Sequence, residues 1–222
     1  MRIFIIILVA VTLLYLTLMG FGVIHAGFPF GKKHGLVKKT VMLDDFEDAD
    51  NDFDWFTGGY AKLEQSTQNQ THGKHSAKVT FYTRDQFKTV PTPLPEITPT
   101  PQPTWQPQII MDTHSVTKIA VFDWQDFTSL KLDVFNSMDR PVTYHLKLSD
   151  SKTFSHETSG VMLSKKVTNI SVLMDDLSQN RIDLSNMNSI QFWVDMTDAT
   201  QPVSVYLDNL RLEFDPGEVK KK

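Results

Sequence analysis

The sequence predicts an all-β protein with two packed sheets, a β-sandwich or jelly roll, and three observations support this prediction. Short apolar runs alternate with polar residues at a period of two, which is the pattern of half-buried strands. Polar turns separate these runs, and no segment longer than a few turns has convincing helical periodicity. Short strands spaced in this way favour a sandwich over βαβ units. The clearest expected strands are residues 41–46, 77–82, 130–135, 142–148, 167–173, 190–194 and 203–212.

The amino-terminal segment, residues 1–26, does not follow this pattern. Residues 3–24 form an almost unbroken apolar run after a single charge, Arg2. Such a run is a signal peptide or a membrane anchor. Its length favours an anchor, and cleavage after Ala26 would place Ile24, not a small residue, at the third position before the cut. We expect an exported domain, either secreted or anchored to the membrane on its extracytoplasmic side, joined to this segment by a tether of residues 27–40.

The composition argues against several classes of function. The chain has 22 basic and 26 acidic residues and a formal net charge of −4, which does not favour binding to nucleic acid. It has no cysteine, so disulfides, thiolate metal sites and a cysteine nucleophile are excluded. The histidines lack zinc-ligand spacing, the carboxylates form no recognisable catalytic pair, and there is no glycine-rich phosphate loop. The sequence therefore predicts a protein that is not an enzyme.

A proline-rich segment, residues 91–107, interrupts the strand pattern with seven prolines. Such a segment prefers the polyproline II conformation and cannot join a central strand. Taken alone it would be an interdomain linker. However, the strands expected before it are too few for a separate domain. We expect a long surface loop inside one domain, residues 41–215, followed by a basic tail of residues 216–222.

Two strand-like strings at opposite ends of this domain carry carboxylates, which strands usually avoid. They are Leu43-Asp44-Asp45-Phe46-Glu47 and Tyr206-Leu207-Asp208-Asn209. A hard cation such as calcium, which prefers oxygen ligands, is one reason for such acids, and solvated charges that protect a sheet edge are another. Strand alternation sends Asp45 and Glu47 to the same face. If the first and last strands are neighbours, Asp45, Glu47 and Asp208 are the expected ligands of a structural Ca²⁺ ion.

A candidate binding face is expected from the alternation in two later strands. In residues 190–195, aliphatic and aromatic side chains share one side, while Gln191, Trp193 and Asp195 share the other. His145 and Lys147 likewise oppose two leucines. An aromatic ring that can stack on a pyranose, next to groups that can bond its hydroxyls, suits a carbohydrate. The candidate ligand-binding residues are Trp193, Gln191, Asp195, His145 and Lys147. The other interpretation is that loops cover this face and that Trp193 is ordinary packing.

Several motifs, taken in order, resemble family-11 carbohydrate-binding modules. The opening of those modules is similar to Met42-Leu43-Asp44-Asp45-Phe46-Glu47, Asp54-Trp55 and Gly58-Gly59-Tyr60. Their aromatic turn and the strand after it are similar to Asp123-Trp124-Gln125-Asp126-Phe127 and residues 130–134. The resemblance continues through residues 182–192 and the closing Tyr206-Leu207-Asp208-Asn209, and it extends to the wider galactose-binding-like jelly rolls. Where the family has an aromatic-rich strand after Tyr82, this chain has the proline-rich segment.

This resemblance implies a two-sheet jelly roll, a structural calcium near the two ends of the domain and a sugar-binding concave face. It also implies that Trp55 and Trp124 are structural. The expected function is therefore non-catalytic binding of a polysaccharide or other glycan. The alternative is a protein-interaction or envelope-assembly domain on the same fold. In that case the proline-rich loop would contact a protein partner, because polyproline II segments fit aromatic grooves.

Overall fold

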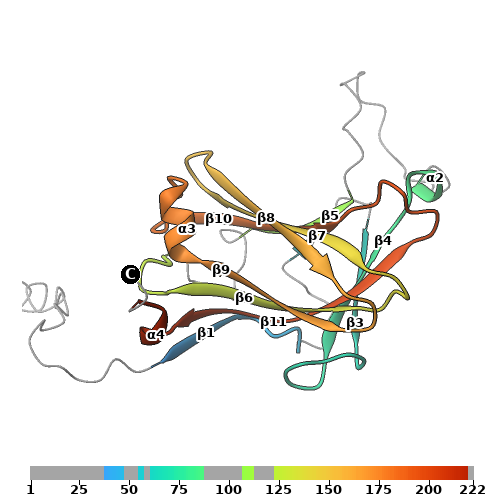
Figure 1. The fold of residues 1–222 in the computed structure, drawn as a ribbon, viewed down its shortest axis with the longest axis horizontal. Helices are drawn as coiled ribbons and strands as arrows, with labels where there is room; N and C mark the ends of the chain where they lie inside the picture. The colour runs from blue at the N-terminus through green and yellow to red at the C-terminus, as the bar shows by residue number, and fades with distance from the viewer. Residues whose placement is uncertain (1–37, 48–54, 58–60, 88–106, 113–122, 220–222) are drawn as a thin grey trace, which may run out of the picture. The chain divides into compact units, whose positions relative to one another are not determined.

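The structure is a computed structural model that describes residues 38–47, 55–57, 61–87, 107–112 and 123–219 (Figure 1). All of these residues belong to one compact unit, Val37–Lys222. The apolar run of residues 3–24, the acidic residues 48–54 and nearly all of the proline-rich segment lie outside the described residues. Within the described ranges, no helix is both long enough and apolar enough to cross a bilayer.

The described residues form two antiparallel sheets, which confirms the prediction of an all-β sandwich (Figure 1). A six-stranded sheet has the order β3-β4-β11-β6-β9, with β1 also paired to β11, and a five-stranded sheet has the order β2-β5-β10-β7-β8. The strands are β1 (Lys39–Asp44), β2 (Trp55–Phe56), β3 (Ala61–Ser66), β4 (Ser76–Phe81), β5 (Gln108–Asp112), β6 (Ser129–Asn136), β7 (Val142–Asp150), β8 (Ser155–Met162), β9 (Val167–Leu173), β10 (Met187–Val194) and β11 (Val203–Phe214). Three short helices are also described: α2 (Arg84–Phe87), α3 (Met174–Gln179) and α4 (Pro216–Val219).

The core lies between the two sheets and contains the inward-facing residues of each alternating strand. Phe81, Leu132 and Phe192 are fully buried, and the Phe81 and Phe192 rings lie 6.3 Å apart between centroids. Burial of each such side chain contributes about 1.5–3 kcal/mol of transfer free energy. Trp124 is also fully buried, and its backbone N–H donates to Leu184 O at 2.7 Å. It therefore anchors its turn in the core.

The opening and closing strands are neighbours, as the metal hypothesis required. Strand β1 pairs antiparallel with the second half of β11, from Lys39 opposite Phe214 to Asp44 opposite Leu210. Strand β4 pairs with the first half of β11, Val203–Leu207. Between the two halves β11 has a bulge, at which Asn209 adopts φ of +57°. Asparagine tolerates this left-handed conformation better than most residues. Asp208 thus lies where β11 changes partner from β4 to β1.

Candidate functional site

The outer face of the five-stranded sheet carries a row of side chains that crosses every strand. The register places Phe56 of β2, Ile110 of β5, Gln191 of β10, Lys147 of β7 and Glu157 of β8 in one line. A second row contains Gln108, Trp193, His145 and Ser159. We call these two rows the polar-aromatic face.

The polar-aromatic face is only partly accessible to solvent, and its accessibility varies along the rows. Phe56 is 70% exposed, and most of the other members are half-buried. The intervening residues of the same strands, such as Ile109, Leu146 and Phe192, point into the core and are buried. Strand alternation in the sequence therefore determines which side chains reach this face.

Trp193 and His145 form a stacked pair at the centre of this face. Their ring centroids lie 5.1 Å apart and the ring planes differ by 3°. This separation matches the spacing of neighbouring strands, so both rings stand upright on the sheet. His145 Nδ1 also lies 2.9 Å from Glu157 Oε1, which fixes the imidazole from the β8 side. One face of the Trp193 indole is covered by the imidazole, and the other is directed toward β5.

The other three predicted residues differ in their settings. Gln191 and Lys147 lie opposite each other, and within the described residues neither side chain makes a hydrogen bond or ion pair. Asp195 follows the end of β10 and is exposed, and its Oδ1 accepts the hydroxyl of Thr197 at 2.6 Å and the Thr197 N–H at 2.8 Å. These two hydrogen bonds lower the pKa of Asp195, with smaller contributions from the charges of His145 and Arg140. Four of the five predicted residues thus share the face, and Asp195 lies at its end.

Sequence reasoning missed Phe56, Ile110, Gln108 and Glu157, because it did not predict β5 or β8 and, although it expected the second strand to begin at Trp55, it gave Phe56 no role. Strand β2 has only two residues, and β5 directly follows the proline-rich segment. Strand β8 is an edge strand in which only Met162 is buried, so it has no apolar stripe. The adjacent pair Trp55 and Phe56, one buried and one exposed, was the available signal for β2.

The carboxylates predicted to bind metal interact mainly with the turn between β3 and β4. Asp208 is 1% exposed, and its Oδ2 accepts the N–H groups of Thr71 and His72. Glu47 Oε1 accepts the N–H groups of Lys74 and His75, and its Oε2 lies 3.1 Å from His75 Nδ1.

Burial raises the pKa of Asp208, despite the hydrogen bonds from this turn. For Glu47, burial opposes ionisation, but the donors from His75 and Lys74 hold its pKa below the usual value. The two carboxylates therefore differ in how well the surrounding structure supports a negative charge.

Glu47 and Asp208 approach the same turn from its two sides, and Asp45 does not. The turn centres on Gly73, whose φ is +66°, and a Cβ there would lie only 2.1 Å from Glu47 Oε1. Asp45 Oδ1 instead accepts the N–H of Glu47 at 3.2 Å. Across the described residues, no three His, Cys, Asp or Glu side chains form a cluster that could hold a metal ion. However, Asp208 Oδ1 is buried with no hydrogen-bond partner in the described structure, and such an orphaned oxygen suits a cation.

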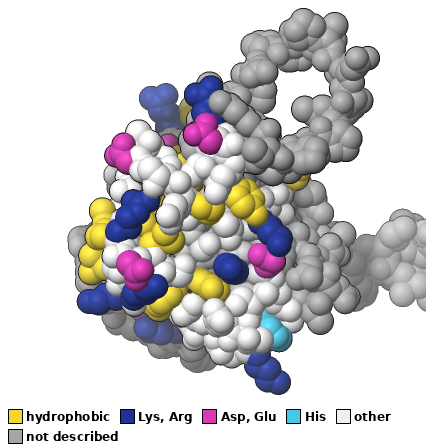
Figure 2. Space-filling model, turned by 90° about the vertical axis from the view of Figure 1, so that its right-hand side faces the viewer, with side chains coloured by type: hydrophobic (Ala, Val, Ile, Leu, Met, Phe, Trp, Pro, Cys, Tyr) yellow, Lys and Arg dark blue, Asp and Glu magenta, His cyan; other side chains and the backbone are white. Residues whose placement is uncertain are grey.

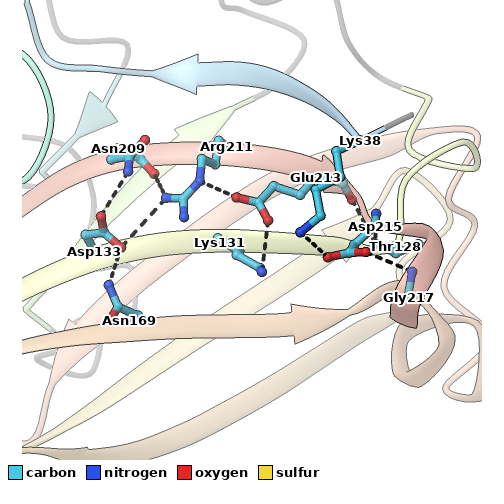
Figure 3. Close-up of polar contacts among 10 residues, drawn as sticks. All are labelled: Lys38, Thr128, Lys131, Asp133, Asn169, Asn209, Arg211, Glu213, Asp215 and Gly217. Carbon is cyan, nitrogen blue, oxygen red and sulfur yellow. Dashed lines mark hydrogen bonds and ion pairs between the residues drawn. The ribbon is translucent and has the colours of Figure 1, made fainter. Parts of the chain in front are cut away.

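The outer face of the six-stranded sheet is occupied by its own polar network (Figure 3). Asp133 of β6 is 5% exposed and accepts the side-chain amides of Asn169 and Asn209 at 2.7 and 2.9 Å. Arg211 donates to Glu213 at 2.6 Å, and Lys131 lies 2.9 Å from the same carboxylate. The amides and hydroxyl around Asp133 lower its pKa although burial opposes ionisation. These groups bind one another, which leaves this face less able to bind a ligand than the polar-aromatic face.

Comparison with solved structures finds the fold of this chain within two agarases. No protein-family model and no curated protein matches the sequence. An exo-β-agarase is similar, with a TM-score of 0.57 and 16% identity over 79% of this chain. The match covers 25% of the agarase, so this chain spans about a quarter of that protein.

Two solved binding modules match over nearly their whole length. A family 11 carbohydrate-binding module from Clostridium thermocellum, in complex with a β-1,3-1,4-mixed-linked tetrasaccharide, has a TM-score of 0.49 and 14% identity over 80% of this chain and 96% of that module. The xylan-binding domain CBM22-1 from Paenibacillus barcinonensis has a TM-score of 0.48 and 13% identity over 80% and 96% of the two chains. Family 11 modules, which the sequence resembles, are thus among the solved structures similar to this chain.

Proposed function

We propose that this protein binds polysaccharide without altering it, through the polar-aromatic face. One observation carries the proposal: the stacked Trp193–His145 pair lies beside Gln191 and Lys147, whose side chains have no partner among the described residues. Aromatic rings provide apolar area with little loss of conformational freedom, and nearby amides and charges can bond hydroxyls. The exposed part of the half-buried Trp193 indole would stack on a pyranose ring, while Gln191 and Lys147 would bond its hydroxyl groups.

The dimensions of the face suit an extended chain better than a single sugar. Its first row crosses five strands, from Phe56 to Glu157. Strands lie about 4.8 Å apart, so the four steps between them span about 19 Å. Phe56 would provide an apolar contact at one end of this row, and the Glu157 carboxylate would accept hydroxyl hydrogens at the other. Asp195 would contribute beyond the end of β10.

We propose that the polar-aromatic face binds polysaccharide and does not hydrolyse it. A glycosidase requires two carboxyl groups about 5–9.5 Å apart on either side of the scissile bond. The carboxylates at this face instead serve as partners to other groups: Glu157 holds His145, and Asp195 closes a turn with Thr197. The modules named above match over nearly their whole length, whereas the agarase matches over a quarter. Both observations support a binding module.

A structural Ca²⁺ ion is proposed at the β3–β4 turn, with Glu47 and Asp208 as side-chain ligands. The buried oxygen Asp208 Oδ1 supports this proposal, because a cation would satisfy it. Glu47 and Asp208 would hold the turn to β1 and β11 from its two sides. Asp45, which bonds the N–H of Glu47, would position the Glu47 backbone. The bound ion would supply positive charge between two strands and a turn that are far apart in sequence.

The setting of the domain and a second partner are also proposals. The apolar run of residues 3–24 supports export, with the domain secreted or tethered outside the membrane. The seven prolines of residues 91–107 support the alternative function, in which this segment binds a protein partner. The glycan proposal rests on the polar-aromatic face. The residues of that face, among them Phe56 and Ile110, lie outside the proline-rich segment.

Affinity electrophoresis tests the main proposal. The full chain is run through gels containing soluble glucans, mannans or galactans. We expect retardation in at least one gel and its loss in Trp193→Ala. The matched control is Phe154→Ala, which removes an exposed aromatic ring from the β7–β8 turn, outside the face. No retardation in any gel, or equal retardation of the wild-type chain and Trp193→Ala, would remove the proposal.

A further inference from the structure

A polar pocket lies at the end of the sandwich where β6 and β10 finish and β7 and β11 begin. It has a volume of about 280 Å³ and is lined by Met138, Asp139, Arg140, Asp198, Thr200 and Gln201. We call it the end pocket. Its walls are two loops, residues 137–141 and 195–202, and neither contributes to the two rows of the polar-aromatic face. Figure 2 views this end of the molecule, where hydrophobic side chains lie among basic and acidic ones.

The first wall is held in one conformation by a buried asparagine. Asn136 is fully buried, and its amide donates to the carbonyls of Arg140 and Met162 at 2.9 and 3.1 Å. Its Oδ1 accepts the N–H of Met138 at 2.9 Å. Ser164 Oγ donates to the carbonyl of Met138 at 3.0 Å. The backbone on both sides of Asp139 is therefore fixed, so the Asp139 and Arg140 side chains project from a rigid base.

The second wall is held in the same manner, and the two walls are joined. Asp195 Oδ1 accepts the N–H and the hydroxyl of Thr197, and the N–H of Ala199 donates to the carbonyl of Met196 at 3.1 Å. Ser137 Oγ donates to the carbonyl of Ser204 at 2.6 Å, which ties the first loop to the start of β11. A pocket whose walls are already ordered loses little conformational freedom when a ligand binds.

The polar groups that line the pocket are available to a ligand. Within the described residues, the side chains of Arg140, Asp198 and Gln201 make no hydrogen bond or ion pair. Their chemistry is a planar cationic donor, a carboxylate acceptor and an amide that does both. Adjacent hydroxyls of a sugar ring can bond to such groups in pairs, and Met138 offers an apolar contact to the ring carbons.

The charge balance selects a neutral ligand. Asp139 is paired with Lys165 Nζ at 3.2 Å, so its charge is compensated outside the pocket. The remaining charges, Arg140 and Asp198, cancel each other. A carboxylate-bearing sugar would meet the like charge of Asp198, and a cationic ligand would meet that of Arg140. The volume lies just below the roughly 300–1,000 Å³ of typical small-molecule sites, which suits one sugar ring and not a chain.

We propose that the end pocket is a second saccharide site that holds one neutral sugar unit by its hydroxyls, independently of the polar-aromatic face. A protein with both sites could hold the chain of a glycan on its sheet and a single sugar unit at its end. The geometry that carries this inference is the pair of rigid loops that present unpartnered Arg140, Asp198 and Gln201 to one cavity.

Titration by ¹H–¹⁵N NMR tests the proposal on the full chain. The probes are methyl glycosides of glucose, galactose, mannose and xylose, with glucuronate as an anionic comparison, each raised to about 100 mM, which is a hundredfold above a Kd of ~1 mM. We expect saturable shifts of the amides of residues 139–140 and 198–201 with at least one neutral glycoside, and weaker binding of glucuronate. Arg140→Met should weaken binding about tenfold or more, the loss expected for one charged hydrogen bond.

Three further variants separate this site from folding defects and from the proposed glycan face. Asp198→Asn should weaken binding in the same way, which keeps the test valid if Arg140→Met fails to fold. Trp193→Ala should bind the monosaccharide normally, and so should Arg181→Met, a matched arginine that follows α3 at the opposite end of the sandwich (Figure 1). Absence of saturable shifts with every neutral glycoside would overturn the proposal. Unchanged affinity in both pocket variants, or preference for glucuronate, would also overturn it.

Discussion

Replacement of Asp208 by asparagine is the sharpest test of the calcium proposal, because the structure predicts opposite effects with and without the ion. The Asp208 side chain is 1% exposed, and Oδ1 has no partner in the described structure. If that carboxylate is ionised and no cation is present, the unpaired oxygen costs about 1–3 kcal/mol. In chelator, Asp208→Asn should therefore be as stable as the wild-type chain or more stable. Its amide oxygen can still accept the N–H groups of Thr71 and His72.

In calcium, the wild-type chain should instead be more stable than Asp208→Asn. A cation that binds only the folded state at a hundredfold excess over its Kd stabilises it by about 2.7 kcal/mol. For a domain of about 150–250 residues, 1 kcal/mol corresponds to about 2–4 °C in Tm, so the wild-type Tm should rise by about 5–10 °C. Asp208→Asn should lose this rise, and so should Glu47→Gln. The matched control Asp126→Asn, at an exposed position, should keep it.

The assay is thermal unfolding in calcium and in chelator, repeated across pH. Because burial raises the pKa of Asp208 in the folded state above the usual 3.8, the stability that it contributes in chelator should fall as the pH rises from about 3.8 through the folded pKa. Asp208→Asn should not show this loss. If the wild-type Tm is the same in calcium and in chelator, or if Asp208→Asn keeps the full rise, the reasoning is refuted.

Four other predictions address the turn, the network and the glycan face. Gly73→Ala should destabilise the fold by about 1–3 kcal/mol in urea unfolding, because φ is +66° and the new Cβ would overlap Glu47; an unchanged midpoint would contradict this. Asp133→Asn should cost about 1–3 kcal/mol at pH 7. Because the folded pKa of Asp133 is lowered, its contribution is present above about pH 3.8 and is lost as the pH falls through the folded pKa, so the gap in stability between the variant and the wild-type chain should shrink below about pH 3.8; a gap that does not change with pH would count against this role. His145→Ala should weaken glycan retention and lower Tm by about 1–6 °C, because it removes an aromatic pair worth about 0.5–1.5 kcal/mol to the fold; full retention would mean that the stack does not orient Trp193. Deletion of residues 91–107 should abolish binding of a protein partner and leave glycan retention intact, whereas loss of glycan retention would assign this segment to the glycan site.

Period-two alternation was sufficient to predict the strands that have one buried and one exposed face. Strands β7 and β10 alternate almost perfectly in the structure, and their outward residues Lys147, Gln191 and Trp193 were predicted to share a face. The pairing of the first and last strands was expected from their unusual carboxylates, and β1 does pair with β11. For β7 and β10 the signal was local in the sequence and had one physical cause, a strand with one face in the core.

The remaining parts of the site depend on information that the local sequence does not contain. Which strands are neighbours is set by the packing of the whole sandwich, so no local pattern indicated that Phe56, Ile110 and Glu157 would align across β2, β5 and β8. Side-chain partners are equally non-local. Asp208 bonds to a turn 136 residues earlier in the chain, and alternation alone gave no reason to expect that. Strand alternation placed Asp45 and Glu47 on the same face. It could not predict that Asp45 bonds within its own segment whereas Glu47 bonds to the β3–β4 turn.

The two outer faces of the sandwich explain why binding is proposed on only one of them. On the six-stranded sheet, Arg211 pairs with Asp133 and Glu213, and Lys131 pairs with Glu213, so a ligand there would have to break ion pairs that are already made. On the five-stranded sheet, the side chains of Gln191 and Lys147 make no hydrogen bond or ion pair within the described residues, and the half-buried Trp193 stacks on His145 and packs in part against the core. A ligand at that face adds interactions without removing any. Since net binding energy is the difference between bonds gained and bonds lost, we propose binding at the five-stranded sheet.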